Sequence, residues 1–141
     1  MAQAVHSLER MIMPAGNDTQ KPETNQHHVR LYQHNLCPFS ARARYTMACK
    51  GVEFQSVEVD LDQKAQWAVD FNGGSVPILE TPHGHLIPES GIIQQWAMEH
   101  NPSGGLQLIP SDPLEAAKMR VRMDAFGKTL KGLFPSVLSR G

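Results

Sequence analysis

Cys37 is the residue of this sequence whose type and position could support nucleophilic chemistry. It follows the alternating segment 29–33 and immediately precedes Pro38, a residue common in the first turn of helices. We therefore expect Cys37 at the N-cap or N′ position of a helix, where unpaired N–H groups and the positive end of the helix dipole favour the thiolate over the thiol. Because the thiolate is the attacking form, an exposed Cys37 is a candidate nucleophile for thiol–disulfide exchange.

The other thiol does not complete a redox pair. Cys49 lies twelve residues further along the same predicted helix, a separation of about 18 Å at the usual helical rise. No disulfide closes that gap, so we interpret Cys49 as an inert, buried side chain. Ser40 occupies the position of the second cysteine in a C-x-x-C motif. A lone thiolate needs an external thiol to release its mixed disulfide, so the pattern indicates monothiol exchange.

Two arginines follow Cys37 within the next two helical turns. Arg42 and Arg44 could add positive potential near the sulfur. As residues of a helix surface, however, they are predicted to be solvated.

The composition excludes several classes of protein. The chain has 141 residues, enough for one globular domain with or without an appendage, and a formal net charge of −1. No basic excess exists to bind a nucleic acid or an anionic membrane surface. No apolar run approaches the roughly 18 residues that a membrane-spanning helix requires. Two cysteines cannot form the disulfide framework of a secreted scaffold, which indicates a reducing compartment.

The histidine pairs do not predict a metal site. His27-His28 lies in a polar segment and His83-x-His85 lies in a predicted turn, and neither pair has a cysteine or acid at ligand spacing. We therefore interpret these histidines as solvated and assign no metal.

The elements that would position Cys37 alternate between strands and helices. The pattern predicts strands at 29–33, 53–59, 76–80 and 85–87, and helices at 38–50, within 60–70 and from 88–90 to 101–102. The first two strands are joined through a helix and should be parallel, whereas the last two flank a turn at 81–84 and should form an antiparallel hairpin. Pro77 belongs at an edge, at a strand start or in a cis bond, because proline cannot donate to a ladder. The predicted order is α/β, βαβαββα.

Two segments flank this body. Residues 1–28 are polar from Pro14 onward and should form a disordered tail, although Val5, Leu8, Met11 and Ile12 recur at helical spacing. The stretch with these apolar residues has a single strong base, which lies beside an acid. This disfavours a mitochondrial presequence. The predicted compartment is therefore the cytoplasm, with the mitochondrion as the alternative.

The C-terminal segment predicts a helix that needs a partner. Residues 103–111 read as a linker, and Asp112-Pro113 then opens a helical segment at 112–141 that has room for one or two helices. One apolar stripe contains Leu114, Ala117, Val121 and Ala125, and a second contains Met119, Met123, Phe126 and Leu130. A helix with two apolar sides must be covered, so we expect another chain there, or a second copy forming a homodimer.

Three motifs in order make the chain similar to the thioredoxin-like half of glutathione transferases, and most similar to the omega class. These motifs are Cys37-Pro38-Phe39-Ser40, Ser75-Val76-Pro77-Ile78-Leu79-Glu80 and Glu89-Ser90-Gly91-Ile92-Ile93. The resemblance covers residues 29–109. It implies a thioredoxin-like glutathione-binding domain at 29–102, followed by part of the family's all-α second domain at 112–141.

The resemblance also implies a role for each site residue. Cys37 matches the catalytic cysteine that forms a mixed disulfide with glutathione, and Phe39 would wall the thiol. Lys64 would meet the glycine carboxylate of glutathione, and Val76, followed by a cis Pro77, would pair its backbone with the cysteinyl unit. Glu89 and Ser90 match the residues that receive the γ-glutamyl end.

Two functions follow as hypotheses. The first is an omega-like glutathione-dependent thiol transferase, which removes glutathione from mixed disulfides or reduces dehydroascorbate, with glutathione as co-substrate. It predicts that Cys37 is exposed. The second is a non-catalytic transferase-like subunit that serves as a binding or assembly module. It predicts a partner over the helix face around Met119, Met123 and Phe126.

Overall fold

The computed structural model describes residues 8–12, 20–101 and 103–138, with side chains at 20–101 and 103–133. The chain divides into two compact units, Met1–Leu106 and Gln107–Gly141, which are described separately. Within the described residues, no helix is both long and apolar enough to cross a membrane.

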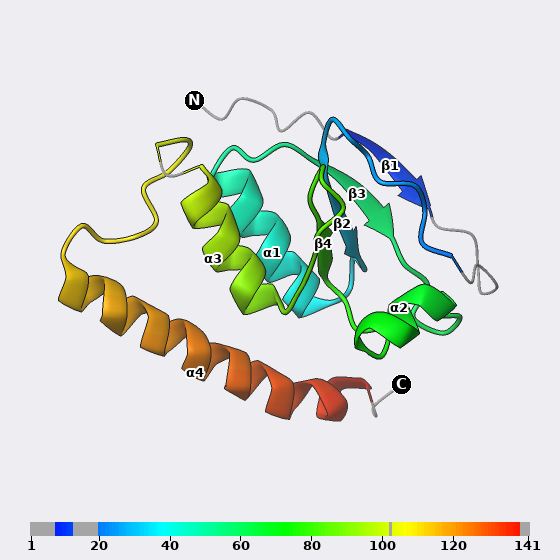
Figure 1. Ribbon diagram of the computed structural model, residues 1–141. Coiled ribbons are helices and arrows are strands. Elements are labelled where there is room, and N and C mark those ends of the chain that lie inside the picture. Colours follow the sequence, from blue (N-terminus) through cyan, green and yellow to red (C-terminus); the bar gives the residue numbers. More distant parts are fainter. Residues whose placement is uncertain (1–7, 13–19, 102, 139–141) are drawn as a thin grey trace. The chain divides into compact units, whose positions relative to one another are not determined.

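The first unit is built on a five-stranded mixed sheet (Figure 1). Its strands, in the spatial order β1-β3-β2-β4-β5, are β1 (Leu8–Ile12), β3 (Phe54–Glu58), β2 (Val29–Gln33), β4 (Ile78–Glu80) and β5 (Leu86–Pro88). The predicted parallel pairing of β2 with β3 is confirmed, with Leu31 opposite Ser56. The predicted hairpin is also confirmed, because β4 and β5 are antiparallel, with Leu79 opposite Ile87.

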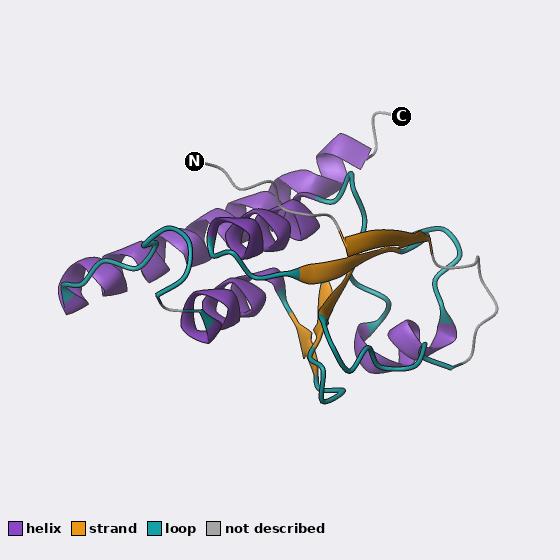
Figure 2. Cartoon of the chain, turned by 90° about the horizontal axis from the view of Figure 1, so that it is seen from above, coloured by secondary structure: helices purple, strands orange, loops and turns teal. Residues whose placement is uncertain are grey.

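Three helices cover the two faces of this sheet. They are α1 (Pro38–Cys49), α2 (Gln66–Asn72) and α3 (Ser90–His100). Helices α1 and α3 lie side by side on one face, and α2 lies on the other (Figures 1 and 2). From β2 onward the elements follow the predicted βαβαββα order.

The alternation of side chains along β2 and β4 fills a core on each face of the sheet. Leu31 and Leu79 belong to the cluster that packs with α1 and α3, whereas Tyr32 and Ile78 belong to the cluster that packs with α2. All five residues of β2 are buried, as expected for a strand covered on both sides. In the second cluster the ring of Tyr32 meets Trp67 edge-on, with centroids 4.9 Å apart.

The sequence predicted a short helix within the polar stretch at 60–70, and helix α2 begins only at Gln66. The Asp60 carboxylate accepts the backbone N–H groups of Asp62 and Gln63, at 2.8 and 3.1 Å, and this holds the start of the stretch in a turn. The helix ends at Gly73, whose φ of +75° caps it in the left-handed conformation.

The N-terminal segment differs from the predicted disordered tail. Residues 8–12 form strand β1, which pairs in parallel with β3, rather than a helical turn. Residues 20–28 contact the sheet, because Lys21 and Thr24 both bind the carboxylate of Glu80. An edge strand of this kind depends on its partner, so its own sequence carries little signal. The remainder of 1–28 lies outside the described residues.

The described residues of the second unit form one helix, α4 (Pro113–Leu138), whereas the sequence left room for two. Asp112 caps it as predicted: its carboxylate accepts the N–H of Glu115 at 2.9 Å, and Pro113 follows directly.

Candidate functional site

Cys37 lies at the end of the loop that connects strand β2 to helix α1. It is the N-cap residue of α1, with extended backbone angles of φ −80° and ψ +117°, and Pro38 is the first residue of the helix. The carbonyl of Cys37 accepts the first helical hydrogen bond from Ala41 at 2.9 Å. The predicted position at a helix start is therefore confirmed, and the sulfur lies at the helix end that favours an anion.

Val76 brings a second segment to this thiol. The Sγ of Cys37 lies 3.9 Å from the carbonyl oxygen of Val76, which precedes strand β4. The peptide bond between Val76 and Pro77 is cis, one of the three places predicted for Pro77. A strand-like backbone edge and a cysteine sulfur thus meet, although they lie far apart in the sequence.

Cys37 is less accessible than the sequence suggested. We expected an exposed thiol, but the residue is only 5% exposed. The backbone N–H of Cys37 bonds to the His34 carbonyl in a tight turn, and the sulfur rests against Val76 instead of projecting from the helix. The expectation of an exposed sulfur is therefore wrong for this state of the protein.

Lys64 is placed beside the segment that leads to Val76. Its side chain is exposed and lies over Gly74, since a Cβ at Gly74 would come within 2.6 Å of the Lys64 Cδ. Gly74 has a φ of +70° and carries no side chain that would displace the lysine. The structure therefore places the Lys64 side chain beside Gly74, two residues before Val76.

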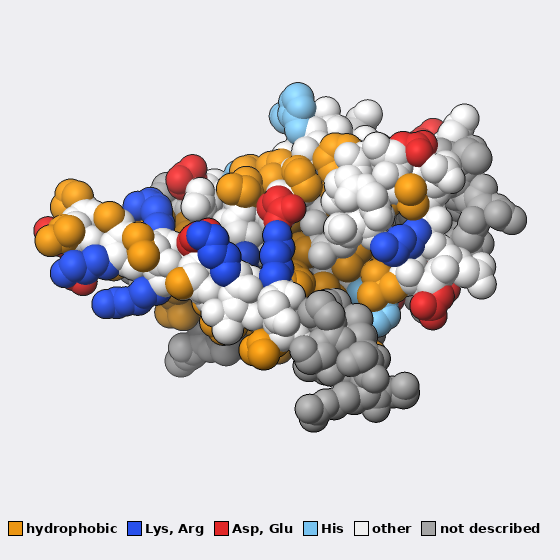
Figure 3. Space-filling model, turned by 90° about the horizontal axis from the view of Figure 1, so that it is seen from below, with side chains coloured by type: hydrophobic (Ala, Val, Ile, Leu, Met, Phe, Trp, Pro, Cys, Tyr) orange, Lys and Arg blue, Asp and Glu red, His pale blue; other side chains and the backbone are white. Residues whose placement is uncertain are grey.

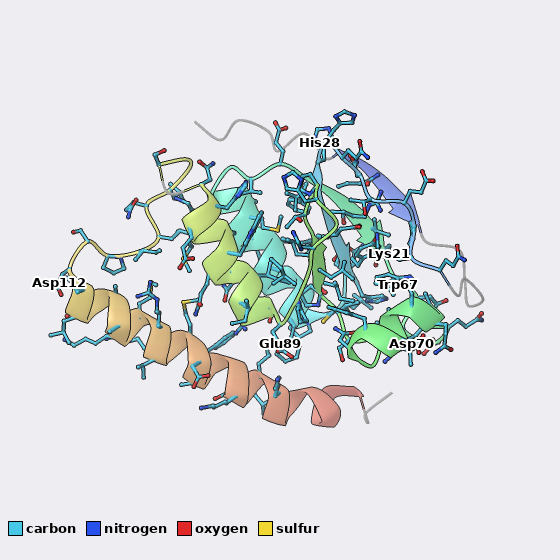
Figure 4. The ribbon with its side chains drawn as sticks, in the orientation of Figure 1. Lys21, His28, Trp67, Asp70, Glu89 and Asp112 are labelled. Atoms are coloured by element: carbon cyan, nitrogen blue, oxygen red, sulfur yellow. The ribbon has the colours of Figure 1, made fainter. Side chains whose placement is uncertain are left out.

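Glu89 and Ser90 form the start of α3 (Figure 4). Glu89 is the N-cap residue and has a φ of +69°, the only non-glycine residue in the described part of the chain with a positive φ. Ser90 is the first helical residue and is 4% exposed. A strained backbone that persists at one residue is a frequent mark of a functional site.

The sequence did not identify Arg42 as part of this arrangement. Arg42 was predicted to be solvated, but it is half-buried, and its Nη2 donates to the Oγ of Ser90 at 3.0 Å. Burial lowers the pKa of Arg42, and the nearby charge of Glu89 acts in the opposite direction. The contact joins α1 to α3, and only the packing of two helices far apart in the sequence could show it.

The remaining candidates are placed as follows. Phe39 lies in the first turn of α1 and is half-buried, and its role as a wall of the site stays a prediction. Arg44 is half-buried rather than solvated and donates to the Oε1 of Gln33. Both thiols are free, as predicted, but Cys49 is half-buried rather than fully buried.

The arrangement can bind a small molecule with charges at both ends. Lys64 supplies a cation beside Gly74, and Glu89, Ser90 and Arg42 supply an anion, a hydroxyl and a cation at the start of α3. The backbone at Val76, whose carbonyl lies beside the Cys37 sulfur, can pair with an extended peptide.

Comparison with known proteins identifies the same region. Residues 27–99 match the family model described as glutathione S-transferase, N-terminal domain. Glutathione S-transferase omega-1 of Mus musculus is 32% identical over 101 residues, which are 71% of this chain and 41% of the mouse protein.

Solved structures share the fold. Glutathione transferase Omega 3C from Trametes versicolor matches with a TM-score of 0.67 and 28% identity, over 82% of this chain and 48% of that one. A glutathione transferase homologue from sulfitobacter, solved with bound glutathione, matches with a TM-score of 0.63 and 23% identity, over 71% of this chain and 49% of that one. This chain spans less than half the length of each of these three proteins.

Proposed function

The chain belongs to the glutathione S-transferase family, and from that membership we propose that it is an omega-like, glutathione-dependent thiol transferase. The observation that carries the proposal is the 3.9 Å approach of the Cys37 sulfur to the Val76 carbonyl at the start of α1. This juxtaposition puts a nucleophile beside a backbone edge that can hold a cysteinyl peptide. Among the family's classes, a cysteine at this position supports the omega class.

In the first step the Cys37 thiolate attacks the glutathione sulfur of a mixed disulfide. A bond forms between the Cys37 sulfur and that of glutathione, and the bond to the substrate's sulfur breaks. The substrate leaves as a thiolate and takes up a proton. The Val76 carbonyl, which now faces the Cys37 sulfur, would accept the N–H of the glutathione cysteinyl unit.

A second glutathione then regenerates the enzyme. Its thiolate attacks the glutathione sulfur held on Cys37, so oxidised glutathione leaves and the Cys37 thiolate returns. Each turn therefore consumes one free glutathione, because the other half of the oxidised glutathione comes from the mixed disulfide. Reduction of dehydroascorbate by the same thiol chemistry is a further activity that we propose. This cycle needs a pool of reduced glutathione, so we propose a reducing compartment, the cytoplasm or alternatively the mitochondrion.

Charge complementarity positions glutathione in both steps. Glutathione carries two carboxylates and one ammonium group. We assign the glycine carboxylate to Lys64 and the γ-glutamyl end to Glu89 and Ser90, with Phe39 and Pro77 at the sides of the thiol.

The test is adduct formation with oxidised glutathione. Intact-mass and peptide mass spectrometry should find one glutathione per chain, on Cys37. Cys37→Ser should abolish the adduct, whereas Cys49→Ser is the matched control on the same helix and should leave it unchanged. An adduct on Cys49, or on neither cysteine, would refute the thiol transferase.

One observation favours a second candidate, a non-catalytic binding or assembly module. Cys37 is 5% exposed, and a buried thiol is a poor nucleophile. In that case glutathione would bind without forming a covalent adduct, or would not bind. The Cys37→Ser variant would fold normally. Retention on immobilised glutathione without any adduct would favour this candidate over the transferase.

A further inference from the structure

We propose that Arg42 is a positioning residue of the glutathione site, which holds the Ser90 hydroxyl so that its proton points to the α-carboxylate of the γ-glutamyl group. This inference rests on the proposed function and adds a residue to it. Arg42 acts from α1 on a hydroxyl at the start of α3.

The first argument for this role is the direction of the hydrogen bond between Arg42 and Ser90. Arginine has only N–H donors and no acceptor, so in the 3.0 Å contact Nη2 donates and the Oγ of Ser90 accepts. A serine hydroxyl has one proton. Because the Ser90 oxygen accepts a hydrogen bond from the Arg42 cation, this proton points away from Arg42. The Ser90 hydroxyl is thereby polarised and becomes a better donor to an anion.

The surroundings of Arg42 carry the second step. In the part of the chain that the structure describes, its Nε and Nη1 are buried without a hydrogen-bond partner. A buried cationic donor that lacks a partner destabilises the fold. The guanidinium is therefore poorly explained as a stabilising tie between two helices, and its place beside Ser90 points to ligand binding.

The charge pattern carries the third step. Glu89 is close enough for its charge to act on Arg42, while Arg42 bonds Ser90. The γ-glutamyl end of glutathione has an ammonium and a carboxylate on one carbon. The Glu89 carboxylate matches the ammonium group. The Ser90 hydroxyl, which Arg42 supports, matches the carboxylate.

The experiment measures the affinity of the full chain for glutathione and two of its fragments. Both glutathione and γ-glutamylcysteine contain the γ-glutamyl end, and cysteinylglycine lacks it. NMR titration covers all three, including millimolar affinities. For Arg42→Met we expect a loss of about ten- to a hundredfold for the first two ligands, as for a hydrogen bond to a charged group, and no change for cysteinylglycine.

Matched variants separate positioning from structure. Arg44→Met makes the same substitution on the same helix, at a residue bonded to Gln33, and should leave all three affinities unchanged. Arg42→Lys keeps the charge and should recover part of the loss. Because Arg42 acts through Ser90, Arg42→Met in a Ser90→Ala background should change glutathione affinity within about twofold. The thermal midpoint of Arg42→Met should be unchanged or higher, since two buried N–H groups without partners among the described residues are removed.

The outcomes distinguish this inference from the proposed function. If the wild-type chain binds glutathione and Arg42→Met binds it equally well, the inference is wrong and the proposed function stands. An equal loss of affinity for all three ligands would show that Arg42 has a structural role. The same conclusion would follow if Arg42→Met unfolds while Arg42→Lys binds every ligand like wild type. A wild-type chain that binds neither glutathione nor γ-glutamylcysteine would overturn the proposed function and the inference together.

Discussion

At the scale of single residues, the backbone of Glu89 departs most from what its side chain prefers. Its φ of +69° and ψ of +113° belong to a sparsely populated region that is less strained for glycine than for a residue with a Cβ. Such a conformation costs about 1–3 kcal/mol. The fold retains glutamate there, which is expected if the carboxylate serves the site.

Two substitutions at Glu89 separate the backbone from the carboxylate. Both Glu89→Gly and Glu89→Ala remove the carboxylate, but only glycine relieves the strain. We expect Glu89→Gly to be more stable than Glu89→Ala by about 1 kcal/mol in urea unfolding. Both variants should lose the same glutathione affinity. Equal stability of the two variants would contradict a strained Glu89.

The site residues differ in how far the sequence could predict them. Cys37, Val76 and the start of α3 are encoded by local patterns: a cysteine before a helix proline, a Val-Pro step before a strand, and a helix start. Arg42 carries no such pattern, because its partner Ser90 lies on another helix. The burial of Cys37 was missed for the same reason, since the Val76 carbonyl covers its sulfur from a distant segment.

At the scale of elements, one carboxylate ties the N-terminal segment to two strands of the sheet. Glu80 of β4 is 1% exposed and is bound by Lys21, Thr24, Arg30 and Tyr32. Burial acts to raise the pKa of Glu80, but the hydrogen bonds from Lys21, Thr24 and Tyr32 and the charge of Lys21 outweigh it, so the pKa is lowered from its ordinary value. Burial also raises the pKa of Tyr32, so its hydroxyl stays a donor to Glu80.

This network predicts an acid-dependent loss of stability. A carboxylate with a lowered pKa in the folded state stabilises the protein above its unfolded pKa, and that contribution disappears as the pH falls through the folded value. The free energy of unfolding should therefore decline below about pH 4.5. Glu80→Gln should be less stable by about 3 kcal/mol at pH 7, because Lys21 and Arg30 lose their anion.

Urea unfolding between pH 7 and pH 3 measures this difference. The curves of wild type and Glu80→Gln should converge as the pH falls. Glu53→Gln removes an exposed carboxylate and is the control that should keep the wild-type slope. A Glu80→Gln curve parallel to that of wild type would exclude Glu80 as the source.

The elements themselves were largely predictable, with one informative exception. Strands β2 and β4 and helices α1 and α3 each show their own periodicity or start and stop residues. Strand β1 and the contacts of 20–28 do not, because they depend on β3 and on the buried Glu80. A polar segment thus gains order from a single buried anion that its own composition does not reveal.

At the scale of the whole molecule, the two units differ in how their apolar side chains are used. The first unit buries its apolar residues in two clusters on either face of the sheet. On α4 of the second unit, Leu114, Val121, Phe126 and Leu133 are each more than half exposed. Figure 3 shows apolar and basic side chains side by side on that helix. The sequence predicted this two-sided helix, and its need for a covering partner stays a prediction.

Self-association through α4 is the whole-molecule consequence that we expect. Sedimentation equilibrium should show a mass that rises from one chain toward two with concentration. Val121→Glu should shift this equilibrium toward one chain by about a hundredfold or more, because a symmetric interface loses the burial of two valines. Tyr45→Glu is the matched control, since Tyr45 on α1 is 68% exposed and Val121 is 69% exposed. If the mass stays at one chain throughout, or if Tyr45→Glu acts as strongly as Val121→Glu, α4 is not the surface through which copies of this chain associate.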